Sequence, residues 1–296
     1  MAQSSIRTFG DVAVSVASRA PASLTDTAPD HRTALHPGAW MAWATLGGIV
    51  AFTTTNPFYL LVLWAIAWFV FAQQRVPGPA SRSFRIFLIA GLLAIVVRTT
   101  LVFFGTFNAA NVTHFAIEGL RLATILVIFG TFNAVTDPFG VVRLAPRRFQ
   151  EPALAAALAL SIAPRTVASL QRVREAQQLR GIPTRGVRAL PALAIPVLEA
   201  GMEEALVLAE SMDSRGHGRG RRSRYRPQSW NAAAWAMATT AFVAAGVFWM
   251  ASTRGLGDLQ PGTDPLHWPT VGPFMLAAEA LLVVPGFLPR QGSARR

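Results

Sequence analysis

Two arginine residues, each followed directly by glycine, are the residues of this sequence best suited to a defined chemical task. The two motifs are Leu179-Arg180-Gly181 and Ser214-Arg215-Gly216. A guanidinium group stays charged at neutral pH and presents five N–H donors in a rigid fork. This geometry suits charge-assisted hydrogen bonds to carboxylates. The chemistry expected of Arg180 and Arg215 is therefore docking into an acidic groove on another protein.

Each Arg-Gly motif ends a segment with the pattern of an amphipathic helix. The first segment begins at Pro164, a residue that suits the first turn of a helix, and alternates apolar residues with Arg and Gln. The second segment begins at Leu190 and separates an apolar stripe from a row of glutamates. The stripe consists of Ile195, Leu198, Met202, Leu206 and Ala209.

The position of each motif predicts a blunt, exposed helix end. The last carbonyls of a helix are unpaired and carry a partial negative charge, which favours a cation there. Glycine then allows the left-handed conformation that ends many helices. The plainer interpretation is that each Arg-Gly pair is only a well-capped helix end, but the sequence contains this ending twice.

Composition places these helices in a membrane protein. The chain has 296 residues, of which 52% are apolar and 14% charged. This balance is typical of a multi-spanning membrane protein. There is no cysteine, which excludes disulfides, thiolate metal sites and cysteine nucleophiles. All 27 basic residues are arginine, so a phosphate-binding loop with its lysine is also excluded.

The apolar residues gather into segments long enough for about six membrane spans. The first run is divided by Asn56-Pro57, a strong turn signal, into two short spans. A polar stretch that includes Asn108 and Glu118 is expected to be a loop. Residues 153–163 are apolar but too short to cross a bilayer core of about 30 Å. The expected spans fall within residues 40–72 (two spans), 84–104, 119–135, 230–252 and 271–288.

The arginines are unevenly placed, and this predicts the topology. With six spans, 24 arginines fall in the tails, in residues 73–85 and in the middle of the chain, and the remaining three are Arg98, Arg121 and Arg254. Cytoplasmic segments carry such an excess of basic residues. We therefore expect both termini and the middle domain on the cytoplasmic side of a cell membrane.

The expected fold is all-α, a polytopic membrane protein with a cytoplasmic domain of amphipathic helices. Residues 219–226 form an arginine-rich run beside a membrane entry, which indicates contact with lipid headgroups of the bilayer rather than nucleic acid. The expected divisions are a disordered tail (1–33), transmembrane helices 1 to 4 (34–137), the coupling-helix domain (138–229), transmembrane helices 5 and 6 (230–290) and a short tail (291–296).

These features together resemble a known family. The Thr-Asn-Pro bend, the amphipathic middle and the two Arg-Gly helix ends are similar to those of the T component of energy-coupling factor (ECF) transporters, the CbiQ/EcfT family. The resemblance covers roughly residues 34 to 290. It differs at Leu179, where a small residue is usual, and at His36-Pro37, where many members have Asp-Pro.

The resemblance implies a bacterial importer of a vitamin or metal. The T component is a non-catalytic transmembrane coupling subunit that works with two ATP-binding-cassette ATPases and a membrane substrate-binding S component. In the family the two arginine tips sit in grooves of the ATPases, and the long coupling helices cross and support the S component. Arg180 and Arg215 would make these contacts here, with Gly181 and Gly216 permitting the tips. ATP and Mg²⁺ would be used by the partner subunits, and this chain would bind no cofactor itself.

Two ionisable residues lie inside expected spans, where a charge is costly. They are Arg98 and Glu279. They could pair with each other, or Glu279 could face the substrate-binding subunit. Alternatively, Arg98 could extend its guanidinium to the outer membrane surface.

Other functions have less support in the sequence. The five histidines have no metal-ligand spacing, and no local signature links Ser, His and Asp into a catalytic triad, so we expect neither a metal site nor an enzyme. A membrane-anchored scaffold or receptor with a basic domain that binds lipid or protein remains the alternative. In such a protein Arg180 and Arg215 would matter no more than Arg172 or Arg222.

Overall fold

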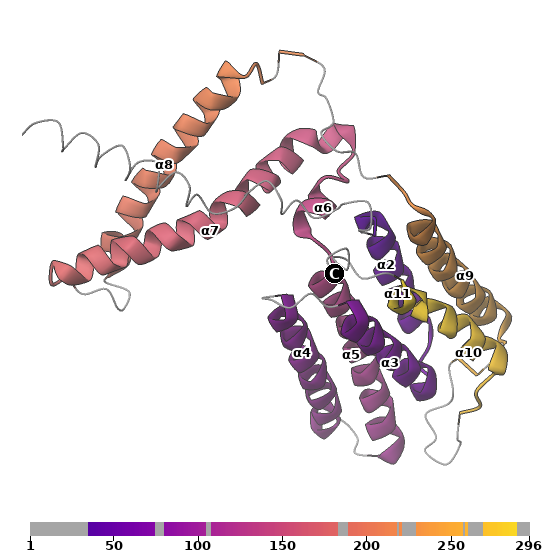
Figure 1. Cartoon of the computed structure of the whole chain (residues 1–296). Coiled ribbons are helices and arrows are strands. Elements are labelled where there is room, and N and C mark those ends of the chain that lie inside the picture. Colours follow the sequence, from indigo (N-terminus) through magenta and orange to yellow (C-terminus); the bar gives the residue numbers. More distant parts are fainter. Residues whose placement is uncertain are drawn as a thin grey trace, which may run out of the picture.

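A computed structural model describes residues 35–74, 80–104, 108–182, 189–217, 219–220, 229–256, 258–259 and 269–288. All regular structure in these ranges is helical, as the sequence predicts. The expected tails, residues 1–33 and 291–296, lie outside the described residues, as does most of the arginine-rich run. Figure 1 shows a bundle of apolar helices from which two long helices, α7 and α8, project.

The bundle begins with two helices joined by a sharp bend. Helix α2 spans Pro37–Thr53 and α3 spans Pro57–Gln74, so the division predicted at Asn56-Pro57 is confirmed. The Asn56 side chain fixes the bend because its Oδ1 accepts from the Phe58 N–H at 3.0 Å. Its Nδ2 donates to the carbonyl of Asp258 at 2.9 Å, which ties the bend to the loop before the last helices.

Helices α4 (Ala80–Thr100) and α5 (Ala109–Val135) pack side by side along their length (Figure 1). A short 3-10 helix, η1 (Leu101–Phe104), follows α4. Glycine allows the close approach: a Cβ added at Gly119 would lie 2.8 Å from the Cα of Ile95, and one at Gly130 would lie 2.7 Å from Phe87. Small residues bring membrane helices together in this way.

Helix α5 starts earlier than the sequence predicts. The polar stretch from Asn111 to Glu118 was expected to be a loop, but it forms the first turns of α5. Its polar side chains are compatible with a helix, because Glu118 forms ion pairs with Arg98 of α4 and with Arg121 of α5. The Thr113 hydroxyl donates a hydrogen bond to the carbonyl of Ala109, one turn earlier in the same helix. The expected end at Asp137-Pro138 is confirmed, since α5 ends at Val135 and Asp137 caps the start of the short helix α6, Pro138–Val142.

Helix α7 spans Gln150–Leu179, after the 3-10 turn η2 (Arg147–Phe149). The expectation that Pro164 starts a helix is wrong, because Pro164 lies inside α7 and joins residues 153–163 to the following segment. Proline removes one hydrogen bond and favours a kink, but the alanine- and leucine-rich sequence around it is strongly helical. Helix α8 spans Leu190–Ser214 and contains Pro196 in the same way.

The C-terminal helices close the bundle against α2 and α3. They are α9 (Ala232–Arg254), α10 (Pro273–Ala280), the 3-10 turn η4 (Leu281–Val283) and α11 (Val284–Phe287). The Trp43 indole donates to the carbonyl of Leu282 at 3.0 Å. The Gln74 amide donates to the carbonyls of Pro285 and Leu288 at 2.8 and 3.0 Å. Buried polar side chains of α2 and α3 thus donate hydrogen bonds to backbone carbonyls of the last segment, where the helix is irregular.

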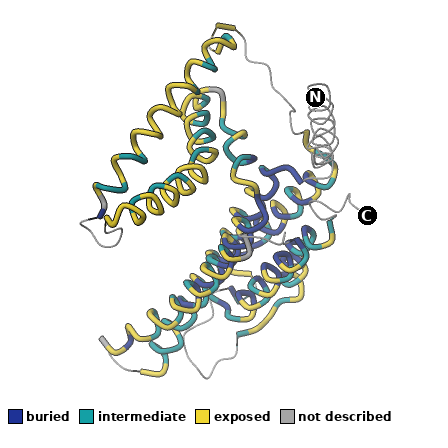
Figure 2. The backbone as a smooth tube through the Cα atoms, turned by 60° about the vertical axis from the view of Figure 1, so that its left-hand side comes forward, coloured by how far each residue is buried: buried dark blue, intermediate teal, exposed yellow. Residues whose placement is uncertain are grey.

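Burial differs sharply between the two parts of the molecule (Figure 2). The core lies among α2, α3, α5, α9 and α10, with Trp40, Tyr59 and Phe248 among its fully buried side chains. No residue of α7 is buried, and none of the described residues of α8 is buried either. The bundle therefore has its own hydrophobic core, whereas α7 and α8 contribute no buried residue that the structure describes.

Five helices in the described residues are long and apolar enough to cross a membrane. They indicate a membrane protein. Four correspond to expected spans: α3, α4 with η1, α5 and α9. The fifth is α7, whose apolar half was expected to be too short on its own. Of the remaining two expected spans, the segment Pro273–Phe287 is a shorter apolar helix, and α2 has only 17 residues.

Candidate functional site

The two Arg-Gly motifs have the same backbone geometry. Arg180 and Arg215 are the cap residues that directly follow α7 and α8, and Gly181 and Gly216 have φ values of 74° and 75°. This is the left-handed region, which an L-residue enters at a cost. The left-handed glycine caps predicted from sequence are therefore confirmed.

The hydrogen bonds at both ends form the same six-residue pattern. At the end of α7, the Gly181 N–H donates to the carbonyl of Gln178 and the Ile182 N–H donates to that of Gln177, both at 3.0 Å. At the end of α8, the Gly216 N–H donates to Asp213 at 2.8 Å and the His217 N–H to Met212 at 3.0 Å. This pair of bonds defines the Schellman cap. Each arginine is thereby held on a helix end whose backbone is ordered.

The motif side chains are exposed. The side chains of Arg180, Arg215 and Ser214 are exposed, and Leu179 is 91% exposed. Beside the tip of α8, an ion pair joins Arg219 to Asp213 at 3.3 Å, where both side chains face solvent. The motif guanidinium groups are therefore accessible to a partner, as docking requires.

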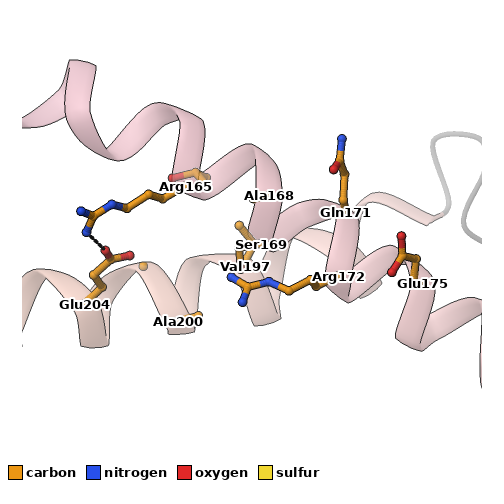
Figure 3. Close-up of a pocket in the computed structure, with 11 residues that line it drawn as sticks. Arg165, Ala168, Ser169, Gln171, Arg172, Glu175, Val197, Ala200 and Glu204 are labelled. Carbon is orange, nitrogen blue, oxygen red and sulfur yellow. Dashed lines mark hydrogen bonds and ion pairs between the residues drawn. The ribbon is translucent and has the colours of Figure 1, made fainter. Parts of the chain in front are cut away.

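Helices α7 and α8 touch each other through polar contacts. The Arg165 guanidinium pairs with the Glu204 carboxylate at 2.9 Å (Figure 3), and the Gln177 amide approaches the carbonyl of Ala192 at 3.4 Å. Between these contacts lies an open cleft of about 550 Å³. Arg172 and Glu175 of α7 line it, together with small residues of α8. An exposed ion pair is weak, so this helix pair is loosely connected compared with the bundle.

Apolar side chains are exposed on both helices. The apolar stripe of α8 lacks a covering partner among the described residues, and four of its side chains are each more than 60% exposed: Ile195, Leu198, Met202 and Leu206. Val167 and Leu170 of α7 are 56% and 41% exposed. The ends of α7 and α8 that carry the motifs lie at opposite ends of the helix pair in Figure 1. The pair thus offers two charged tips with an apolar surface between them.

Arg98 pairs with Glu118, not with Glu279. Its guanidinium lies 3.2 Å from Glu118 Oε2, which also accepts from Arg121 at 2.8 Å. The Arg121 guanidinium also lies 5.1 Å from the centre of the Phe52 ring. The proposed pairing of Arg98 with Glu279 is therefore wrong, because the carboxylate on the adjacent helix α5 is within reach. Glu118 and Arg121 were not recognised as this site, although their i, i+3 spacing is a sequence signal.

Glu279 lies inside the bundle. Its side chain is fully buried, and neither carboxylate oxygen has a hydrogen-bond partner among the described residues. Helices α2 and α3 contain no basic residue, and the only one in α9 is Arg254 in its last turn. The idea that Glu279 faces an outside subunit is wrong for this structure, because its side chain points into the protein.

His36 takes the capping role that an aspartate would have before Pro37. Its Nδ1 accepts from the Gly38 N–H at 3.1 Å, and its ring stacks on Trp230 at 4.6 Å between centroids. Burial lowers the pKa of His36 from its ordinary value of 6.5. A neutral imidazole can therefore replace the carboxylate cap of the resembled family at this position.

Comparisons with known proteins identify no family. No family model matches the sequence, and no curated protein matches it. Within the described ranges, no group of three or more His, Asp or Glu side chains is placed to hold a metal ion. The functional argument therefore depends on the geometry of the helix ends and on the pattern of the sequence.

Proposed function

We propose that this protein is the transmembrane coupling subunit of an ECF-type importer. Its two Arg-Gly tips would dock into grooves of two ATP-binding-cassette ATPases in the cytoplasm. The ATPases would bind ATP and Mg²⁺, and a separate membrane S component would bind the vitamin or metal that is imported. This chain would carry no catalytic group.

The observation that carries this proposal is the duplicated cap. Two helices of different length, α7 and α8, end in the same backbone geometry with an exposed arginine at the same position. One such end is ordinary, because about a third to a half of helices end with a left-handed residue. Two matching charged ends on one projecting pair suit a protein that contacts two similar partners.

The loose connection between α7 and α8 supports a mechanical role. When the ATPases close on ATP, their grooves would move the two tips, and the helices would tilt or slide against each other. The ion pair between α7 and α8 that joins Arg165 to Glu204 is exposed, so sliding would cost little. The apolar faces would transmit this motion to the S component, which would turn and release its cargo inward.

The contacts of Arg180 and Arg215 would hold the two ATPases on this subunit. Removing one partner of a buried, hydrogen-bonded charge pair costs about 2 to 5 kcal/mol. We therefore expect Arg180→Ala plus Arg215→Ala to lose the ATPases when tagged protein is purified from its native membrane in mild detergent. The matched control is Arg174→Ala plus Arg219→Ala, which removes two exposed arginines from the same two regions. Equal losses in both variants, or no ATPase with the wild type, would favour the membrane-anchored scaffold instead.

The proposal also requires α7 to stay on one side of the membrane. The apolar part of α7 ends at Pro164, and the part beyond it carries Arg165, Arg172 and Arg174. The apolar part alone is too short, so a span would have to extend past Pro164 and include Arg165, and such a charge costs about 2.5 to 3.5 kcal/mol at the centre of a bilayer. The exposed ion pair of Arg165 fits water better than lipid.

The absence of cysteine makes this requirement directly measurable. Single cysteines at Glu151 and Leu179, both exposed, mark the two ends of α7. We expect a membrane-impermeant maleimide to label both only when it is admitted to the cytoplasmic side of the cells. Labelling of the two positions from opposite sides would show that α7 crosses the membrane and would remove the coupling domain from the proposal.

A further inference from the structure

The cluster of Arg98, Glu118 and Arg121 carries an unbalanced positive charge. Both arginines pair with one carboxylate oxygen, Glu118 Oε2, at 3.2 and 2.8 Å. Two guanidinium groups and one carboxylate leave a net charge of one. The Nε atoms of both arginines are buried and have no acceptor in the part of the chain that the structure describes. The cluster therefore has one more positive than negative charge, and its two Nε–H donors have no acceptor among the described residues.

The cluster lies where the surface of a membrane would be. Arg121 packs over Phe52, the penultimate residue of α2, and Arg98 is near the end of α4. The neighbouring helix α3 has 18 residues, so its length is about 27 Å, close to the roughly 30 Å of a bilayer core. The end of α2 and the start of α3 therefore mark the edge of the hydrocarbon layer.

This edge is at the end of the bundle away from α7 and α8. In Figure 1 those helices leave the bundle from the top, through α6, whereas α4 and α5 reach the bottom of the picture. Arg98 is the most accessible member of the cluster, with 34% of its side chain exposed, against 20% for Arg121 and 12% for Glu118. A group arriving from the membrane surface would meet Arg98 first.

We propose that Arg98 and Arg121 form a binding site for the phosphate group of an anionic phospholipid. A phosphate oxygen is the acceptor that the planar fork of arginine recognises best. Lipid headgroups are held at this depth by the bilayer itself, and the exposed apolar side chains of α4 on the hydrocarbon side of the cluster, such as Val96 and Leu93, can contact the acyl chains. The headgroup supplies the missing negative charge, while Glu118 holds the two guanidinium groups in place.

The test compares lipid binding by variants that change the charge of the cluster in opposite directions. The purified full-length protein is titrated with phosphatidylglycerol and with phosphatidylcholine in detergent, and bound lipid is counted by native mass spectrometry. We expect the wild type to prefer phosphatidylglycerol. Arg98→Gln should reduce this preference about tenfold or more, the effect of losing one direct hydrogen bond between charged groups. Glu118→Gln raises the cluster charge to two and should increase the preference.

The matched control is Arg254→Gln, which removes an exposed arginine from the end of α9 that faces the same side. It should leave the preference unchanged. Equal reductions in Arg98→Gln and Arg254→Gln would overturn the proposal, because the lipid would then respond only to overall charge. An unchanged preference in Arg98→Gln would overturn it as well. Displacement of the lipid by inorganic phosphate at millimolar concentration would assign the site to a free anion and would overturn the lipid assignment.

Discussion

The substitution Gly181→Ala tests whether the cap geometry at the end of α7 matters. A Cβ added at Gly181 meets no atom within 4 Å, so the alanine methyl group causes no clash. The cost is then only that of holding an L-residue at φ 74°, about 1 to 2 kcal/mol. Since 1.4 kcal/mol is a factor of ten, the capped end should open about 5 to 30 times more often. The bundle should remain folded, because no residue of α7 is buried.

Hydrogen exchange measures this opening directly. The amides of residues 181 and 182 make the two cap bonds, so their protection should fall by the same factor. The control is Gly201→Ala, in the middle of α8, where an added Cβ also meets nothing within 4 Å. Because glycine is unfavourable inside a helix, this variant should gain about 0.5 to 1 kcal/mol. Equal changes in the two variants would refute the left-handed cap, and ATPase binding that survives Gly181→Ala would refute its role in docking.

Three further predictions concern helix packing and charged groups. Gly119→Ala should cost about 1 to 3 kcal/mol of stability, because its Cβ would meet the backbone of α4 at 2.8 Å, whereas Gly246→Ala should be neutral or stabilising, as thermal unfolding in detergent will show. His36 binds a proton less readily when folded, so stability should be full above about pH 6.5 and fall as the pH drops through its lowered pKa; a His36→Gln variant with the same pH profile would contradict this. Arg165→Ala should change the free energy of unfolding by less than about 1 kcal/mol, because the ion pair with Glu204 is exposed. The coupling energy between Arg165→Ala and Glu204→Ala in a double-mutant cycle should also stay below about 1 kcal/mol, and a larger value would contradict this.

The helix ends could be predicted because local chemistry decides them. At Asn56-Pro57 and Asp137-Pro138 the proline disfavours helical backbone in the residue before it, and the Asn or Asp side chain caps the helix that follows; both effects depend only on neighbouring residues. The same holds for Gly181 and Gly216, since only glycine enters the left-handed region cheaply. These features required no knowledge of the tertiary structure.

The path of α7 could not be predicted from such local rules. Proline suits a first turn, and that preference placed a helix start at Pro164. In the structure the helix continues through Pro164 because the residues before it are strong helix formers and no glycine interrupts them. A proline signal therefore marks either a start or a kink, and only the flanking sequence separates the two.

The partner of Arg98 depends on how closely two helices approach. Glu118 directly precedes Gly119, where the missing side chain allows α4 to come so near that a Cβ would lie 2.8 Å from the Cα of Ile95 and 3.3 Å from the Cβ of Arg98. The ion pair is thus a consequence of the glycine contact. Glu279 is an equally plausible partner by composition, but it lies on α10, which packs against α3 and α9. A glycine inside an apolar helix indicates such a close helix contact, and Gly119→Ala should therefore weaken the Arg98 pair together with that contact.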